Sequence, residues 1–327
     1  MDIAQGARII VERWLQARRD DVIHFVTDET KTREAQAFAA AAEACGAVPK
    51  ISVLASGAVQ SGEVIEEMRE IMSYANAIVG ATNHSFITTN AVAYALKRGA
   101  RFLSLPLSTN NGSSLLEQEF LRMDPRRAAS LGKPLLRALH GADTVRVTTP
   151  LWTDLTLSVR GRRPGMFNGV AGRPGMCASA SFEVYIPPVE TETNGRIVLD
   201  GSLGYIGLVR EPLELIFEHG YLTRIGGTPD GERLRSYIEG FGDREMYCAA
   251  EFGIGLNEIS RCRGVSYIED ESTYGTFHIG FGRNLALGGE HEAAGHFDIV
   301  PLRPTITVDG RAVMRDGEVL RRHLPWR

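Results

Sequence analysis

The stretch VIHFVTDETKTREAQAFAAAAEACGAVPKISVLAS, residues 22–56, indicates the fold of the first half of the chain. It begins and ends with short apolar runs, which we interpret as strands over Val22–Asp28 and Ile51–Ser56. Its Ala-rich middle, residues 33–47, predicts a helix that ends at Gly46. A strand, a helix and a second strand joined in this way are typical of two parallel strands in one sheet.

The alternation of strand and helix continues to about Pro150. We expect helices over residues 63–74 and 89–97, and strands over Asn76–Thr82 and Arg101–Pro106. Because these strands are apolar along nearly their whole length, they predict a parallel sheet with helices on both faces. Neither GxGxxG nor GxxxxGK[ST] follows the first predicted strand, so the sequence does not support a nucleotide site.

After Pro150, apolar and polar residues alternate in short runs separated by Gly and Asn. Thr153–Gly161 alternates throughout, which predicts a half-buried antiparallel strand, and the one helix expected here covers Asp230–Gly240. With a boundary near residues 146–152, we predict an α/β protein: an N-terminal parallel α/β domain, residues 1–148, and a mostly β domain, residues 149–327. Further strands are expected over Phe182–Ile186, Gly195–Leu199, Tyr221–Ile225, Thr276–Phe281, Phe297–Pro301 and Ile306–Val308.

Composition argues against several classes of function. The 327 residues include 36 Lys and Arg against 40 Asp and Glu, a net charge of -4, so the chain lacks the basic surface that nucleic-acid binding requires. No apolar run reaches the roughly 18–20 residues that cross a bilayer, and MDIAQGARIIVERWLQARRDD at the start predicts an amphipathic helix, not a signal peptide. The four cysteines lack zinc-site or disulfide-framework spacing. We expect a cytoplasmic protein with a small-molecule substrate and no nucleic-acid or membrane partner.

Five side chains in the second half have the chemistry of metal ligands. Glu183 lies in SFEVYI and Glu251 in CAAEFGIGLN, apolar settings in which a carboxylate is costly unless it is paired or bound to a cation. His278 lies in GTFHIGFG. GHFDIV contains His296 and Asp298, whose side chains point to one side of a strand because they are two residues apart. Imidazole and carboxylate ligands together suit zinc, manganese, cobalt or iron(II).

Each of these residues also has an ordinary interpretation when it is considered alone. A Glu in a strand often forms an ion pair with Arg, and a His in a β-rich segment is more often a satisfied core or surface residue than a ligand. A cation shared among all five explains several buried polar groups in one domain at once. His140, His219 and His323, in contrast, are expected at the surface.

Seven blocks of the second half occur in a fixed order: TP-x-x-TDL (149–155), EVYIPPVETETNG (183–195), EFGIGLN (251–257), GTFHIGFGR (275–283), GG (288–289), HFD (296–298) and TVDGRAVMRDGEVL (307–320). They resemble the thermophilic metallo-aminopeptidase family of the aminopeptidase T type. In that family two cocatalytic metals are held by residues that match Glu183, Glu251, His278, His296 and Asp298. The resemblance implies two divalent ions per chain (Zn, Mn or Co), a homodimer, and metal-activated water that hydrolyses an amide or other C–N bond.

ANAIVGATNHS, residues 75–85, resembles the region with the catalytic histidine in a related family, the 2,5-dihydroxypyridine 5,6-dioxygenases, and His84 is the matching residue. The chain is also closer to that family in length and in its first half. That resemblance implies one iron(II), a histidine where Glu251 stands here, and apolar residues at the positions of His278 and Glu183. With residues matching His296 and Asp298, such enzymes have a two-histidine, one-carboxylate triad.

Three carboxylates and two histidines favour the first resemblance, so the leading prediction is an aminopeptidase-like metal-dependent hydrolase. Glu183 or Glu251 would be the general base, and His84 would bind the substrate or protonate the leaving group. Arg283 would bind a substrate carboxylate or pair with a metal-ligand carboxylate. Leu285, where the aminopeptidases have Tyr, and Trp152, where TDL motifs commonly have Gly, depart from their pattern. The alternatives are a non-haem iron(II) dioxygenase that opens a hydroxylated pyridine or aromatic ring, and a non-catalytic metal-binding or small-ligand-binding protein.

Overall fold

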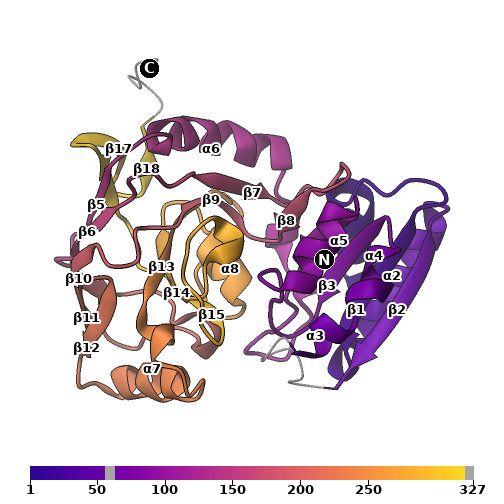
Figure 1. Ribbon diagram of the computed structural model, residues 1–327, viewed down its shortest axis with the longest axis horizontal. Coiled ribbons are helices and arrows are strands. Elements are labelled where there is room, and N and C mark those ends of the chain that lie inside the picture. Colours follow the sequence, from indigo (N-terminus) through magenta and orange to yellow (C-terminus); the bar gives the residue numbers. More distant parts are fainter. Residues whose placement is uncertain (56–62, 321–327) are drawn as a thin grey trace. The chain divides into compact units, whose positions relative to one another are not determined.

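The computed structural model describes residues 1–55 and 63–320, which form two compact units (Figure 1). The first unit comprises Met1–Pro125 and Phe167–Ser181, and the second comprises Arg126–Met166 and the described residues from Phe182 on. The expected boundary between residues 148 and 149 falls inside the second unit. Residues 321–327, the last of the predicted second domain and the location of His323, lie outside the described part of the chain.

The first unit is built on a five-stranded sheet of the order β2-β1-β3-β4-β8, in which all neighbouring strands are parallel. The predicted parallel α/β architecture is therefore confirmed. The fifth strand, β8, belongs to the segment Phe167–Ser181, which follows a part of the second unit in the sequence. It could therefore not be predicted from the first 148 residues. The strands are β1 (Val22–Asp28), β2 (Val48–Leu54), β3 (Ala77–Ala81), β4 (Arg101–Ser104) and β8 (Cys177–Ser179).

Helices cover both faces of this sheet. On one face, Phe38 of α2 (Thr32–Ala44) stacks on Phe25 of β1 with ring centroids 5.2 Å apart. On the other face, Val26, Ile78 and Phe102 form a core with buried side chains of α3 (Glu63–Glu67), α4 (Arg69–Ser73) and α5 (Asn90–Lys97). The N-terminal helix is also present, as α1 (Ile3–Arg8) continued by the π-helix η1 (Ile9–Trp14).

Two elements of the first unit differ from the prediction. The edge strand β2 begins at Val48 instead of Ile51, and Ser56, its expected last residue, lies outside the described residues. The helix expected over residues 63–74 is divided into α3 and α4, which are five residues each and meet at Met68. Because α4 ends at Ser73, the sheet face beside it borders a pocket.

The second unit is mostly β and contains an eight-stranded antiparallel sheet of the order β12-β11-β10-β6-β5-β16-β17-β18. A five-stranded sheet has the order β15-β14-β13-β9-β7. The strands of the larger sheet are β5 (Thr144–Thr148), β6 (Asp154–Ser158), β10 (Thr193–Leu199), β11 (Leu213–Glu218), β12 (Tyr221–Ile225), β16 (Thr305–Val308), β17 (Arg311–Arg315) and β18 (Glu318–Val319). Those of the smaller sheet are β7 (Gly165–Asn168), β9 (Phe182–Ile186), β13 (Ala249–Gly255), β14 (Phe277–Gly282) and β15 (His296–Ile299).

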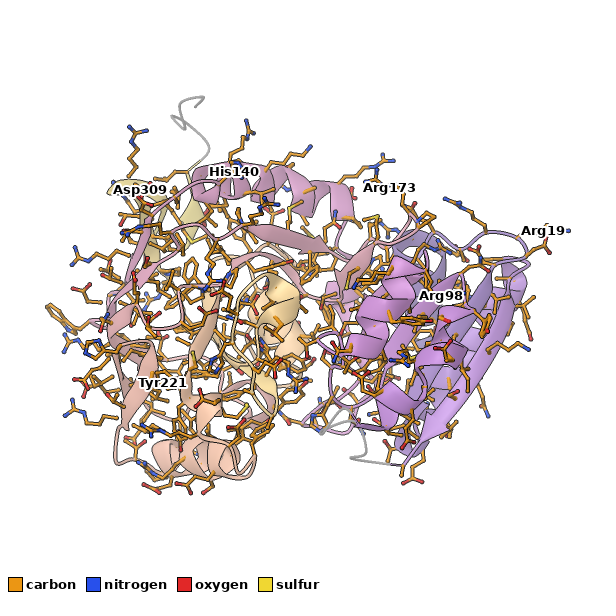
Figure 2. The ribbon with its side chains drawn as sticks, viewed as in Figure 1. Arg19, Arg98, His140, Arg173, Tyr221 and Asp309 are labelled. Carbon is orange, nitrogen blue, oxygen red and sulfur yellow. The ribbon has the colours of Figure 1, made fainter. Side chains whose placement is uncertain are left out.

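The second unit has more helix than predicted. The expected helix is present as α7 (Pro229–Glu239), but α6 (Pro125–Leu139) and α8 (Tyr267–Ser272) were not expected. Helix α6 contains Gly132 and Pro134, residues that argue against a helix in sequence reasoning, and it forms because Leu131, Leu135 and Leu139 are buried. His140, just after α6, is exposed (Figure 2), as is His219, in agreement with the prediction. Among the described residues, no helix is both long and apolar enough to cross a membrane.

Candidate metal centre

The five-stranded sheet of the second unit has one apolar and one polar face. Side chains alternate between the two faces of a strand, so Phe297 and Ile299 of β15 point to one side and His296 and Asp298 to the other. The apolar face carries Phe252, Ile254, Phe277, Ile279, Phe281, Phe297 and Ile299, all fully buried. The polar face carries the five predicted ligands, from β9, β13, β14 and β15.

Strand register brings the predicted ligands of three strands together. Gly280 of β14 pairs with Glu251 of β13 on one side and with Asp298 of β15 on the other. A Cβ atom on Gly280 would lie 2.8 Å from the Glu251 Cβ, 2.8 Å from the Asp298 Oδ1 and 2.7 Å from the His296 Cε1. The absence of a side chain at Gly280 therefore leaves the space in which these three side chains converge.

Strand β13 supplies one acid and two glycines to the same face, Glu251, Gly253 and Gly255. The His278 ring lies directly over Gly253, where a Cβ would collide with its Nε2 atom. Gly255 lies opposite Glu183 and is crossed closely by the backbone at the end of α8. Because Gly253 and Gly255 have no side chains, the EFGIG segment leaves room on this face of the sheet for the neighbouring side chains.

All five predicted ligands lie in one cluster. The His278 Nε2 is 2.7 Å from the Glu183 Oε2 and 4.0 Å from the Glu251 Oε1. The His296 Nε2 is 3.1 Å from the Glu251 Oε2 and 3.5 Å from the Asp298 Oδ1. Two groups of three residues overlap in this cluster and share Glu251: Glu183–Glu251–His278 and Glu251–His296–Asp298. In each group the ligand atoms lie within 4.8 Å of one another. Their role as metal ligands stays a prediction.

Burial and the charges of neighbouring side chains shift the pKa values of the clustered acids and histidines strongly. Burial, together with the Glu183 charge, raises the pKa of Glu251 to about 7. Burial alone would lower the pKa of His278, but the charge and hydrogen bond of Glu183, together with the charges of Asp298 and Glu251, outweigh it and raise this pKa to about 9. Such a set of buried acids and imidazoles can exchange its protons for a divalent cation.

The Glu251–His296–Asp298 group fits a divalent cation best. The His296 Nδ1 donates to the carbonyl oxygen of Arg283 at 2.9 Å, which fixes the ring and leaves Nε2 facing the two carboxylates. The Nδ1 of His278, in contrast, is buried with no hydrogen-bond partner in the described chain. Two carboxylates and one oriented imidazole are suitable donors for iron(II), manganese or zinc.

Glu271 of α8 is a buried acid at this site that the sequence reasoning missed. It lies in YIEDES, where three acids near one another look like a solvated surface, but it is 5% exposed. Burial, followed by the charges of Asp298, Glu183 and Glu251, raises the pKa of Glu271 well above its ordinary value. The raised pKa favours the neutral form of Glu271, which can donate a hydrogen bond to the Asp298 carboxylate.

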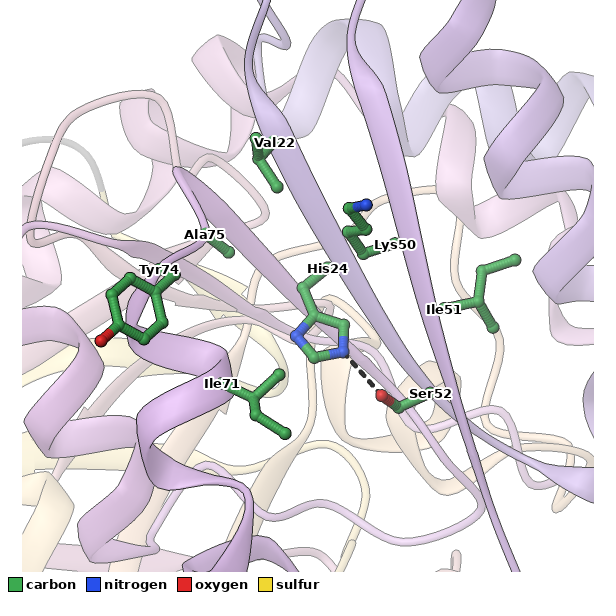
Figure 3. A pocket seen from close by; sticks show the side chains of 8 residues that line it. All are labelled: Val22, His24, Lys50, Ile51, Ser52, Ile71, Tyr74 and Ala75. Carbon is green, nitrogen blue, oxygen red and sulfur yellow. Dashed lines mark hydrogen bonds between the residues drawn. The ribbon is translucent and has the colours of Figure 1, made fainter.

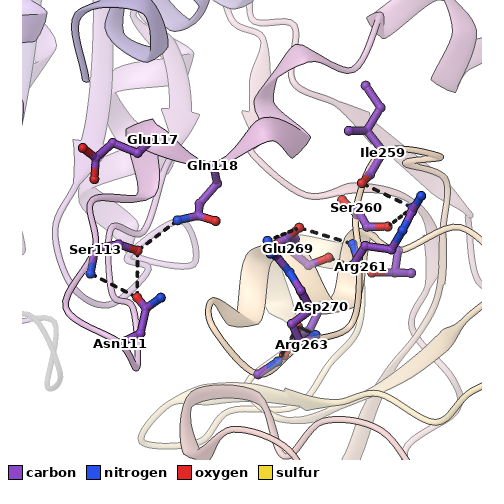
Figure 4. Close-up of polar contacts among 12 residues, drawn as sticks. Asn111, Ser113, Glu117, Gln118, Ile259, Ser260, Arg261, Arg263, Glu269 and Asp270 are labelled. Atoms are coloured by element: carbon purple, nitrogen blue, oxygen red, sulfur yellow. Dashed lines mark hydrogen bonds and ion pairs between the residues drawn. The ribbon is translucent and has the colours of Figure 1, made fainter. Parts of the chain in front are cut away.

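Helix α8 is held in place by its other two acids (Figure 4). The backbone N–H groups of Arg263 and Gly264 donate to the Asp270 Oδ1 at 2.8 and 3.0 Å. The Arg263 guanidinium pairs with the Glu269 Oε2 at 2.7 Å. These contacts fix the short helix that brings Glu271 to Asp298.

The other two predicted site residues, Arg283 and His84, are not among the clustered ligand side chains. Arg283 donates from Nε to the carbonyl oxygen of Ala293 at 3.0 Å, and among the described residues it forms no ion pair with a carboxylate, the alternative given for it above. His84 belongs to the first unit, where the Thr82 hydroxyl donates to its carbonyl oxygen at 2.6 Å and the Asn83 N–H donates to Asp28. Burial lowers the pKa of His84, although the Asp28 charge opposes this. The substrate-related roles of both residues stay predictions.

The two departures from the aminopeptidase pattern lie at exposed positions. Trp152, 75% exposed, adopts a φ of 71° in the turn between β5 and β6. Leu285, 42% exposed, begins the 3-10 helix η7 (Leu285–Leu287).

The chain combines an α/β unit with a β unit whose buried cluster of acids and imidazoles has donor types that suit a divalent cation. The chain belongs to the NicX family, described as 2,5-dihydroxypyridine 5,6-dioxygenase, whose sequence profile matches residues 4–321.

Individual relatives support this assignment. A 2,5-dihydroxypyridine 5,6-dioxygenase from Pseudomonas putida KT2440 is 31% identical over 145 residues, which is 41% of each chain. A solved structure of the Pseudomonas putida KT2440 dioxygenase matches with a TM-score of 0.81, at 20% identity, over 98% of both chains. Wild-type AmpT from Thermus thermophilus matches with a TM-score of 0.68, at 14% identity, over 97% of this chain and 98% of its own. These two structural likenesses show a shared fold.

The comparisons correct the leading functional prediction. The prediction of an aminopeptidase-like hydrolase is wrong, because the family to which the chain belongs is described as a dioxygenase. The prediction of an enzyme is confirmed at the level of the family, and the aminopeptidase resemblance reflects a shared fold. Carboxylates and imidazoles serve hydrolytic and oxidative metal sites alike, so the ligand types alone do not determine the reaction.

Proposed function

We propose that this protein is a metal-dependent dioxygenase that opens a hydroxylated pyridine or a related aromatic ring. The observation that carries the proposal is the match of the family profile to residues 4–321, in a chain whose buried ligand cluster fits a divalent cation. Both oxygen atoms of O2 would enter the product, so the reaction requires no other oxidant.

The metal position that we propose is the Glu251–His296–Asp298 group, and iron(II) is the proposed ion. When bound, iron(II) would supply the redox chemistry that activates dioxygen for reaction with the hydroxylated ring. The Arg283 carbonyl would keep the His296 Nε2 directed at the ion, and Glu271 would hold Asp298 in its orientation.

Proton transfer is the role that we propose for His84. Opening a hydroxylated ring requires the removal of a hydroxyl proton, and a neutral imidazole near pH 7 can accept it. Burial, which lowers the pKa of His84, favours that neutral form. The role is supported by the resemblance of residues 75–85 to the segment with the catalytic histidine of the dioxygenases.

The chain also departs from the two-histidine triad. Glu251 contributes a second carboxylate to the proposed metal group, and Glu183 and His278 form a 2.7 Å pair directly beside it. A more anionic ligand set binds a divalent ion more tightly and stabilises its higher oxidation state, so we expect the affinity for the ion and its reduction potential to differ from those of a two-histidine site.

The test is to load the purified protein anaerobically with Fe(II), Mn(II) or Zn(II) and to record oxygen uptake with 2,5-dihydroxypyridine and other hydroxylated rings. We expect one O2 consumed per ring with Fe(II), and a loss of at least about 100-fold in the Asp298→Asn variant. Asp309→Asn is the matched control, because Asp309 is an exposed turn residue with a φ of 47° that Asn also adopts. Metal binding without oxygen uptake on any of these rings would instead support a binding protein.

A further inference from the structure

A pocket of about 400 Å³ opens on the first unit, over the beginning of β1 and the middle of β2 (Figure 3). It exists because the helix layer does not cover this part of the sheet. The core under α3, α4 and α5 includes Val26, but α4 ends at Ser73 and β2 is an edge strand. The sheet face around His24 and Ser52 therefore borders open space beside α4.

The floor of the pocket is polar where a sheet face under helices is normally apolar. The His24 Nε2 and the Ser52 Oγ are hydrogen-bonded at 2.9 Å, and His24 is 3% exposed. The other ring nitrogen of His24, Nδ1, faces the side of the pocket formed by Tyr74 and Ala75 and has no hydrogen bond among the described residues (Figure 3). Because burial lowers the pKa of His24, the ring is neutral near pH 7 and can offer one N–H.

The charge of the pocket favours an anion. Lys50 pairs with His24 in the strand register, so both side chains lie on the same face of the sheet. Its ammonium group forms no ion pair among the described residues, and no carboxylate lines the pocket. One free cation beside neutral hydrogen-bonding groups is suited to a single carboxylate.

The walls of the pocket are apolar and unusually exposed. Ile71 is 62% exposed and Tyr74 is 76% exposed, and Val22 and Ala75 complete the wall. The Tyr74 ring offers a flat surface for stacking. The volume lies at the lower end of the range for small-molecule sites, which fits a ligand with one ring.

We propose that this pocket is a second binding site, specific for a one-ring aromatic carboxylate. The carboxylate pairs with Lys50 beside the floor formed by His24 and Ser52, and the ring lies against Tyr74 and Ile71. The site is separate from the His84 end of the same sheet, because Val22 and Asp28 are the two ends of β1, roughly 20 Å apart. It does not depend on the proposed dioxygenase activity.

The probe is benzoate, with benzamide as a neutral ligand of the same shape. We expect benzoate to shift the imidazole NMR signals of His24, assigned with the His24→Asn variant, and to bind more tightly than benzamide. Lys50→Gln should weaken benzoate binding about three- to tenfold, since the lost ion pair is partly exposed to solvent. Lys97→Gln is the matched control, because Lys97 is an exposed lysine of the same unit, and it should leave the affinity within a factor of about two.

Two results would overturn the proposal. One is a His24 signal that does not respond to millimolar benzoate in the folded wild-type protein. The other is equal binding of benzoate by wild type and Lys50→Gln, which would place the ligand elsewhere. Tyr74→Ala, a change at an exposed position that should leave the fold intact, provides a further check, because it removes the stacking surface and should also weaken binding.

Discussion

Gly280 shows how one missing side chain shapes the metal centre. Its pairing with Glu251 and Asp298 places those carboxylates on either side of it, and a Cβ would contact both and His296. The five ligand candidates can be recognised in the sequence as polar residues in apolar or Gly-rich segments. The role of Gly280 cannot be recognised in this way, because a glycine has no side-chain chemistry of its own.

Gly280→Ala should therefore impair metal binding. The added methyl group has to displace ligand side chains, so we expect metal content to fall severalfold and stability to decrease by about 1–3 kcal/mol. Metal analysis and urea denaturation measure the two effects. Gly227→Ala is the control, because Gly227 is exposed and a Cβ there meets nothing within 4 Å. Equal metal content in both variants would show that the space over Gly280 is not required.

Substitutions of Glu271 can test whether its carboxyl group is protonated. If it is a neutral acid donating to Asp298, glutamine can replace it, because the amide N–H donates in the same place. In metal-free protein we expect Glu271→Gln to unfold within about 1 kcal/mol of wild type, and Glu271→Ala to lose about 1–3 kcal/mol. Urea denaturation gives both values. Equal losses in the two variants would argue that Glu271 is ionised.

At the scale of elements, only some strands carry a signal that the sequence alone reveals. The strands that were not expected are β5, β7, β8, β11, β13, β17 and β18. Strands such as β9 and β12 begin and end at the predicted residues, because alternation or an apolar run between turns is a local signal. Helix α8 has six residues, all buried, and three of them are acids, so no amphipathic pattern marks it. Its position depends on contacts between Asp270 and the preceding loop, and such contacts are not visible in sequence.

Asp270 should make the free energy of unfolding decrease as the pH rises. Burial is the main cause that raises the pKa of Asp270 from 3.8 to about 6, so between these values the folded protein holds the proton more tightly than the unfolded chain. Its contribution to stability is complete below about pH 4 and is lost as the pH rises through about 6.

Asp270→Asn should reduce this dependence while preserving the helix, because an amide oxygen can still accept from Arg263 and Gly264. Between pH 4 and 6 we expect wild type to lose about 1–3 kcal/mol more than the variant in unfolding free energy. Urea denaturation of the metal-free proteins at several pH values measures the difference. Parallel curves for the two proteins would contradict the raised pKa.

At the scale of the whole molecule, the fold alone did not decide the function. The chain shares its fold with the Pseudomonas putida dioxygenase, at a TM-score of 0.81, and with AmpT, at 0.68. The sequence predicted the parallel sheet, the β-rich half and the ligand candidates, since each produces a local pattern. The reaction class could not be predicted in this way, because it depends on which ion and substrate the assembled site accepts.

Metal removal should affect the stability of the whole protein. The metal would bind a cluster that only the folded chain forms, so at about 100 times its Kd it contributes about 3 kcal/mol to the free energy of unfolding. We expect excess chelator to lower the melting temperature of wild type, measured by calorimetry, and to have little effect on Asp298→Asn. A chelator-dependent shift of equal size in both proteins would mean that the stabilising ion binds elsewhere.

The glycines of β13 and β14 also bear on how such a site can change over time. Gly253, Gly255 and Gly280 leave space on the polar face of the sheet, and the acids and imidazoles of β9, β13, β14 and β15 project into it. One of these side chains can then be exchanged without moving the strands beneath it. One scaffold can in this way acquire a different set of donor atoms, and with it a different chemistry, through substitution of a few side chains.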